Sequence, residues 1–103
     1  MAATTAIAER IDTALRALLG EVDDLPSVAA GWDALSEGNR ASFALGWDHL
    51  MSDYLTEVAE RFATGELSSS QAGQYRMLVG KLRAALPFIE RLNLSRPPAE
   101  LPD

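Results

Sequence analysis

The residues best able to do chemistry lie around His49, the only histidine of the chain. Asp53, Glu57 and Glu60 follow it at helical spacing, so the four side chains would share one polar face. A carboxylate-bridged metal site would need a Glu-x-x-His pair from each of two helices, and the sequence contains no such pair. Acid–base catalysis would need burial that shifts a pKa. We therefore interpret Asp53, Glu57 and Glu60 as a solvated acidic face with a local His49–Asp53 hydrogen bond.

Neither a serine nucleophile nor a phosphate-binding loop is indicated. Ser68, Ser69 and Ser70 precede Gln71 in the pattern of a helix capping box, and no Gly-x-Ser-x-Gly or glycine-rich phosphate loop occurs. Arg61 falls, by helical phase, within an apolar face. We expect it to bind an acid of the first or second helix, or to reach solvent near a helix end; binding of a ligand anion is the alternative. The sequence predicts no catalytic residue, no cofactor and no metal site.

Another row of residues suits binding better than catalysis. It would lie on one side of the helix that follows the serines, away from that helix's apolar stripe. The row combines small residues with two large apolar ones and an arginine rim: Gly73, Arg76, Met77, Gly80, Arg83, Ala84, Phe88 and Arg91. Each glycine inside a helix costs about 1 kcal/mol relative to alanine, so the pair indicates close approach of another backbone. That backbone could belong to a neighbouring helix of the chain or to a partner in an exposed groove.

The elements that carry these residues are two long helices. Apolar residues recur at spacings of three and four over residues 36–64 and again over 68–94, which is typical of amphipathic helices. Gly65 suits the left-handed residue that ends a helix, and so short a turn would make the two helices antiparallel neighbours. Pro87 interrupts the second pattern, and we expect a kink there followed by one or two further turns.

Shorter helices are expected ahead of this hairpin, over about residues 4–19 up to Gly20 and about 26–34, with Pro26 in the first turn. Residues 95–103 contain three prolines and no periodicity, which predicts a flexible tail. The predicted fold is therefore all-α: a three-to-four-helix bundle built on a long antiparallel helical hairpin, with a kink near Pro87. Residues 1–94 would form the single domain. The two tryptophans are expected in the core, although Trp32 lies in an irregular segment and could be exposed.

Composition and charge limit the possible functions. The chain has 103 residues, 48% of them hydrophobic, which is enough for one core, and no cysteine. The net charge is −6, although residues 67–96 carry five basic residues and one acid. The acidic balance argues against direct nucleic-acid binding. No signal peptide or membrane span is indicated, so we expect no membrane partner and a cytoplasmic location. The lysine-poor, alanine-rich composition favours a bacterial source.

These features favour a small non-enzymatic interaction protein that acts through helix faces, as an adaptor, regulatory subunit or assembly factor, with homodimerisation left open. A hairpin of roughly 40 Å against a first helix of roughly 24 Å would leave apolar surface uncovered at one end. One alternative is an acidic inhibitor or nucleic-acid mimic that binds a basic surface through Asp53, Glu57 and Glu60. A further alternative is a helical bundle that binds a small ligand.

Overall fold

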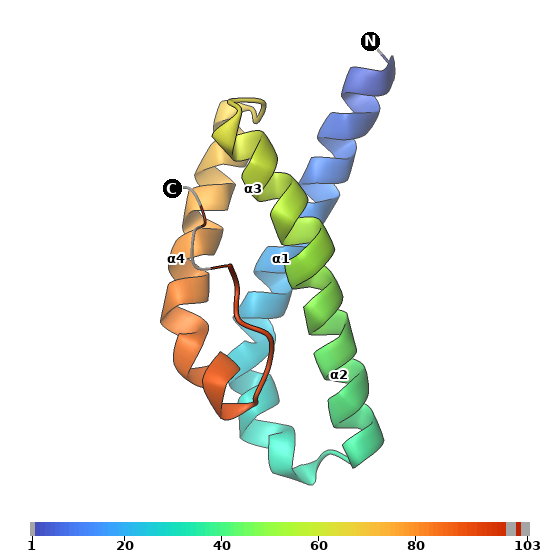
Figure 1. Cartoon of the computed structure of the whole chain (residues 1–103), viewed down its shortest axis with the longest axis vertical. Helices are drawn as coiled ribbons and strands as arrows, with labels where there is room; N and C mark the ends of the chain where they lie inside the picture. The colour runs from blue at the N-terminus through green and yellow to red at the C-terminus, as the bar shows by residue number, and fades with distance from the viewer. Residues whose placement is uncertain (1, 99–100, 102–103) are drawn as a thin grey trace.

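The chain is all-helical, as predicted. A computed structural model describes residues 2–98 and 101, with side chains from residue 6 onward. Its elements in chain order are α1 (Ala2–Gly31), a 3-10 turn η1 (Trp32–Ala34), α2 (Glu37–His49), a π-helical turn η2 (Leu50–Tyr54), α3 (Leu55–Ala63) and α4 (Ser69–Arg91). Because α2, η2 and α3 follow one another without a break, the described residues form three long helices and no strand (Figure 1).

The helix ends around the hairpin follow local sequence signals. Ser36 caps α2, and its side chain accepts a hydrogen bond from the Asn39 amide at 3.1 Å. Gly65 takes a left-handed φ of 74° after α3. The Ser68 hydroxyl accepts from the Gln71 amide at 3.1 Å, and the Ser68 amide donates to the Gln71 side chain at 3.0 Å. The capping box and the glycine stop predicted from the sequence are therefore confirmed.

The front of the chain differs from the prediction, because α1 is one helix of 30 residues rather than two short ones. It runs through Gly20 and Pro26, and it begins at Ala2, before the expected start near residue 4. Val22, Leu25 and Ala29 continue its apolar stripe, and all three are buried. Burial of several side chains, at roughly 1.5–3 kcal/mol for a large one, outweighs the local penalties of glycine and proline. Pro26 is exposed, so water can solvate the carbonyl that lacks its helical partner.

The three long helices enclose one core. At about 1.5 Å per residue, α1 spans roughly 45 Å, close to the 48 Å longest extent of the molecule. The described part of α1 is therefore not the short first helix from which an apolar overhang was expected. α1 packs mainly along α4 and less on η2 and α3, and it lies behind them in Figure 1. The largest fully buried side chains are Trp47, Tyr75, Ile11, Leu15, Leu18, Leu25, Leu55, Leu78, Leu82, Ile89 and Val58.

Only one of the two tryptophans is a true core residue. Trp47 is fully buried, as expected. Trp32 is half-buried at the η1 turn; its ring meets Phe43 edge-on at a centroid distance of 5.9 Å, and the Arg40 guanidinium lies 5.9 Å from its centroid. Trp32 therefore closes the end of the molecule where α1 passes into α2, rather than acting as a free anchor.

α4 continues through Pro87 to Arg91, so one helical turn follows the proline; the kink itself stays a prediction. Asn93 then takes a φ of 56°, and the Leu94 amide donates to the Ile89 carbonyl at 2.9 Å. These two features form a Schellman-type end. They turn the chain back along the bundle.

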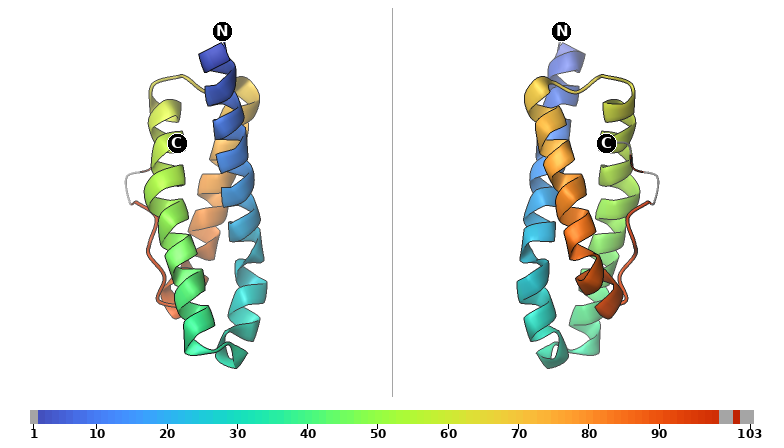
Figure 2. Two further views of the ribbon diagram at one scale, coloured as in Figure 1. Left: turned by 90° about the vertical axis from the view of Figure 1, so that its right-hand side faces the viewer. Right: turned by 90° about the vertical axis from the view of Figure 1, so that its left-hand side faces the viewer.

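Residues 94–98 have no regular secondary structure. They run back along the molecule on the side away from α1, between α4 and the α2–α3 helix (Figures 1 and 2). Residues 99, 100, 102 and 103 of the predicted tail lie outside the described residues. The flexibility expected for residues 95–103 stays a prediction, but the contacts of Ser95 and Arg96 described below were not anticipated from the sequence.

Candidate interaction surfaces

The His49 region forms a local surface pair. His49 Nδ1 lies 2.8 Å from Asp53 Oδ2, and both side chains are exposed. The Tyr54 ring packs against the imidazole at a centroid distance of 5.3 Å. Among the described residues, no three histidine, cysteine or carboxylate side chains gather as metal ligands would. The expected local contact between His49 and Asp53 is therefore present, and it lies at the π-helical turn η2, which the sequence did not predict.

The acidic face formed by Asp53, Glu57 and Glu60 has basic neighbours within the chain. The Arg10 guanidinium on α1 donates from Nε to Glu57 Oε1 at 3.0 Å, and Arg61 Nε lies 3.5 Å from the same oxygen. Asp53 has His49 as its neighbour, whereas Glu60 is exposed. Glu57 thus has two arginine partners within the chain, which reduces the charge that this acidic face presents to another molecule.

Arg61 has different partners from those expected. Its Nη1 donates to Glu66 Oε2 at 2.9 Å, and its Nε lies near Glu57. Glu57 lies on the same helix as Arg61, and Glu66 lies in the turn after it. Neither acid comes from the first or second helix, where the partner was predicted to lie. The Arg61 side chain is 23% exposed, which fits a cation that reaches the molecular surface at a helix end. The ion pairs provide its counter-charge without a ligand anion.

The glycines of α4 face open space. A Cβ built at Gly73 or Gly80 would meet no heavy atom within 4 Å. Met77 lies between them and is 51% exposed, and Ala84 is exposed as well. The close backbone approach inferred from these glycines is therefore not made by a neighbouring helix of this chain. We call the surface formed by Gly73, Met77, Gly80 and Ala84 the outer face of α4.

The rim of this face is basic. Arg76, Arg83 and Arg91 are exposed, and the Arg76 guanidinium lies 5.2 Å from the centroid of the Phe62 ring. Phe88 is half-buried and lines a shallow hollow with Pro26 of α1, so it is an edge of the outer face rather than an exposed anchor. Of the eight partner-binding residues predicted from the sequence, Phe88 alone is not exposed.

A further surface was missed by sequence reasoning. The indole Nε1 of fully buried Trp47 donates to the Ser95 carbonyl at 2.7 Å. Asp48 pairs with the Ser95 hydroxyl, and Arg96 Nη2 lies 3.1 Å from Glu90 Oε1. The only sequence signal for this surface was the charge of Arg96 beside two prolines. That Arg96 pairs with Glu90 becomes evident only once the chain reversal at Asn93 is known.

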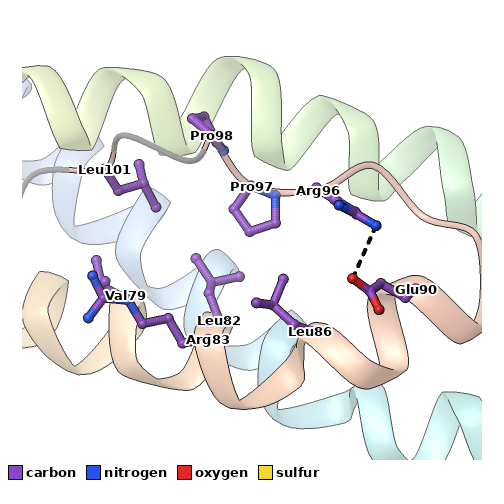
Figure 3. A pocket seen from close by; sticks show the side chains of 9 residues that line it. All are labelled: Val79, Leu82, Arg83, Leu86, Glu90, Arg96, Pro97, Pro98 and Leu101. Atoms are coloured by element: carbon purple, nitrogen blue, oxygen red, sulfur yellow. Dashed lines mark ion pairs between the residues drawn. The ribbon is translucent and has the colours of Figure 1, made fainter.

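Beside these contacts lies a hollow of about 290 Å³ between α4 and the tail. Figure 3 shows α4 side chains pointing toward Pro97 and Leu101 across it. Its lining residues are Val79, Leu82, Arg83, Leu86, Glu90, Arg96, Pro97, Pro98 and Leu101.

No protein-family model, curated protein or solved structure matches the chain. Across the described residues, the helices are too short or too polar to cross a membrane. The functional argument therefore depends on the surfaces themselves.

Proposed function

We propose that the chain is a small non-enzymatic interaction protein, a helical bundle built on its hairpin, and that the outer face of α4 is its contact surface. The observation that carries this proposal is the open backbone at Gly73 and Gly80 on either side of half-exposed Met77. Helix glycines carry a stability penalty, and none of the described residues uses the space that Gly73 and Gly80 leave. A partner helix laid on this face would approach the α4 backbone closely.

The chemistry of the face indicates the kind of partner. Small residues and a methionine form its centre and arginines its rim, which is the usual division between an apolar interface core and a polar edge. Methionine adapts its shape to different contacts. The arginines favour a partner with acidic residues around an apolar stripe. A second copy carries Glu60 on an exposed helix surface, so a homodimer also fits this description.

Affinity capture with three full-length baits tests the proposal. The baits are the natural chain, Gly80→Leu, which fills the open backbone, and Leu45→Ser. Leu45 is 70% exposed on α2, so its replacement removes an apolar side chain elsewhere and serves as the matched control. A partner held by the natural chain and by Leu45→Ser should be lost with Gly80→Leu. Equal retention by all three baits would contradict the assignment of this face.

Light scattering at low and high salt separates the two kinds of partner. A dimer in the natural chain and in Leu45→Ser, but not in Gly80→Leu, would identify a second copy. A monomer in all three directs the search to another protein.

The two alternatives have less support. An acidic inhibitor or nucleic-acid mimic would use Asp53, Glu57 and Glu60, but Glu57 already pairs with two arginines within the chain. A small-ligand bundle would need an interior pocket, whereas the hollow beside the tail lies at the molecular surface. The acidic proposal would gain support if capture depended on Glu60→Gln and weakened steeply with salt.

A further inference from the structure

The tail contacts form a second site, which borders the outer face of α4 at Arg83. Its polar part consists of Trp47 and Asp48 on α2 and Glu90 on α4. Its apolar part is the set of α4 side chains that face the tail in Figure 3: Val79, Leu82 and Leu86. We call these six residues the tail site.

The tail site is suited to an extended backbone. Trp47 is fully buried, and its indole N–H donates to a main-chain carbonyl. A buried donor without a partner costs about 1–3 kcal/mol, so an acceptor is needed at this position. An extended segment supplies free carbonyls, because its backbone makes no internal helical hydrogen bonds. The residue after Ser95 then places a guanidinium beside Glu90, and the next one places a proline over α4.

This combination is the chemistry of proline-segment recognition. Extended proline-rich segments bind apolar grooves, and their stiffness lowers the entropy lost on binding. Here the described groove side chains are aliphatic, Trp47 contributes its buried N–H, and Glu90 lies beside the flanking arginine. In this chain the resident segment is Ser95-Arg96-Pro97-Pro98.

The resident segment fills the site incompletely. The hollow of about 290 Å³ separates it from the apolar residues of α4. The Arg96 and Glu90 side chains are 71% and 53% exposed, and exposed ion pairs are weak. A segment with a larger apolar residue at the hollow would bury more apolar area. Such a segment could displace the tail.

We propose that the tail site binds, in a partner protein, an extended segment with an arginine directly before a proline and a bulky apolar residue after it. The chain's own residues 95–98 occupy the site in cis and compete with that segment. This inference does not depend on the outer face of α4, because none of the six residues of the tail site belongs to that face or its rim.

The test uses full-length chains and a labelled peptide with the sequence of residues 94–103. Two variants loosen the resident tail in opposite ways: Arg96→Glu removes the cation, and Glu90→Arg removes the acid. A second peptide carries the Arg96→Glu change. Fluorescence anisotropy measures affinity, and the Trp47 indole N–H signal in NMR reports whether the peptide reaches the site. Circular dichroism checks that both variants, altered only at exposed residues, keep the fold.

A crossed preference is the expected result. The Arg96→Glu chain should bind the natural peptide about two- to fivefold more tightly than the natural chain does, because the exposed ion pair that helps to hold the competing cis segment is lost. The Glu90→Arg chain should instead prefer the peptide with glutamate. Equal binding by all chains, or no exchange of preference, would overturn the proposal. Dimerisation of the variants without peptide binding would overturn it in favour of tail exchange between copies.

Discussion

At the scale of single residues, Trp47 joins the core to the tail. Replacement by phenylalanine removes the donor to Ser95 and part of the buried ring. We expect a loss of about 2 kcal/mol in the free energy of unfolding, from lost apolar burial and one hydrogen bond. Urea unfolding measures this loss. Trp32→Phe is the control, because Trp32 is only half-buried and should lose less. Equal losses at the two positions would contradict the anchoring role of Trp47.

Glu21 gives a pH-dependent prediction. Burial raises the pKa of its carboxyl above the ordinary 4.5, and the nearby Asp24 carboxylate raises it further. The folded chain therefore holds this proton more tightly than the unfolded chain, so the contribution of Glu21 to stability falls as the pH rises through the raised pKa. Glu21→Gln should unfold at a higher temperature than the natural chain at pH 7, and the gap should narrow below pH 4. Thermal melts at the two pH values measure this difference in unfolding temperature. A difference that grows in acid would contradict the raised pKa of Glu21.

Several residue-scale features could be predicted because they depend on local spacing. The His49–Asp53 contact and the Ser68–Gln71 capping box join residues within one turn of a helix. The partners of Arg61 and Trp47 could not be predicted in the same way. Arg61 donates a hydrogen bond to an acid in the following turn, and Trp47 donates one to a carbonyl 48 positions away. Such choices depend on the three-dimensional path of the chain.

At the scale of the helix elements, two glycines should respond oppositely to alanine. Gly80 is an exposed helix residue with open space around it, so Gly80→Ala should stabilise the chain by about 0.5–1 kcal/mol. Gly65 has a φ of 74°, which is unfavourable for a residue with a Cβ, so Gly65→Ala should destabilise it by about 1 kcal/mol. Chemical unfolding of both variants checks the pair. A destabilised Gly80→Ala chain would mean that the outer face of α4 is occupied within the molecule.

Pro26 tests whether α1 is continuous. In a helix interior, proline lacks an amide donor and crowds the preceding turn. Pro26→Ala should therefore raise the free energy of unfolding by about 1–2 kcal/mol, after allowance for the more flexible unfolded chain. Urea titration measures the change. An unchanged or lower stability would favour the two short helices that the sequence pattern predicted, with Pro26 at the start of the second.

The elements also differ in how far sequence alone could define them. The hairpin helices have strong periodicity and clear caps, and their ends were predicted within a few residues. α1 was divided wrongly, because Gly20 and Pro26 are local signals and the burial of Val22, Leu25 and Ala29 is a tertiary effect. The π-helical turn η2 has no simple sequence signature, so it was missed.

At the scale of the whole molecule, the continuous α1 changes the basis of the functional argument. The difference in length from which an apolar overhang of the hairpin was predicted is not found, since α1 has 30 residues. What remains is an open, arginine-rimmed face on α4, on a chain of net charge −6. The sequence indicated the residues of this face, but whether a neighbouring helix covers it depended on the packing of all three helices.

The most direct test of this account is the affinity of the isolated partner, or of a second copy if the chain dimerises, for Gly80→Leu relative to the natural chain. Titration calorimetry would measure it, with Leu45→Ser as the control. We expect Gly80→Leu to bind at least about tenfold more weakly, a loss of about 1.4 kcal/mol, while Leu45→Ser binds as the natural chain does. Unchanged affinity for a folded Gly80→Leu chain would contradict the claim that the outer face of α4 is the contact surface.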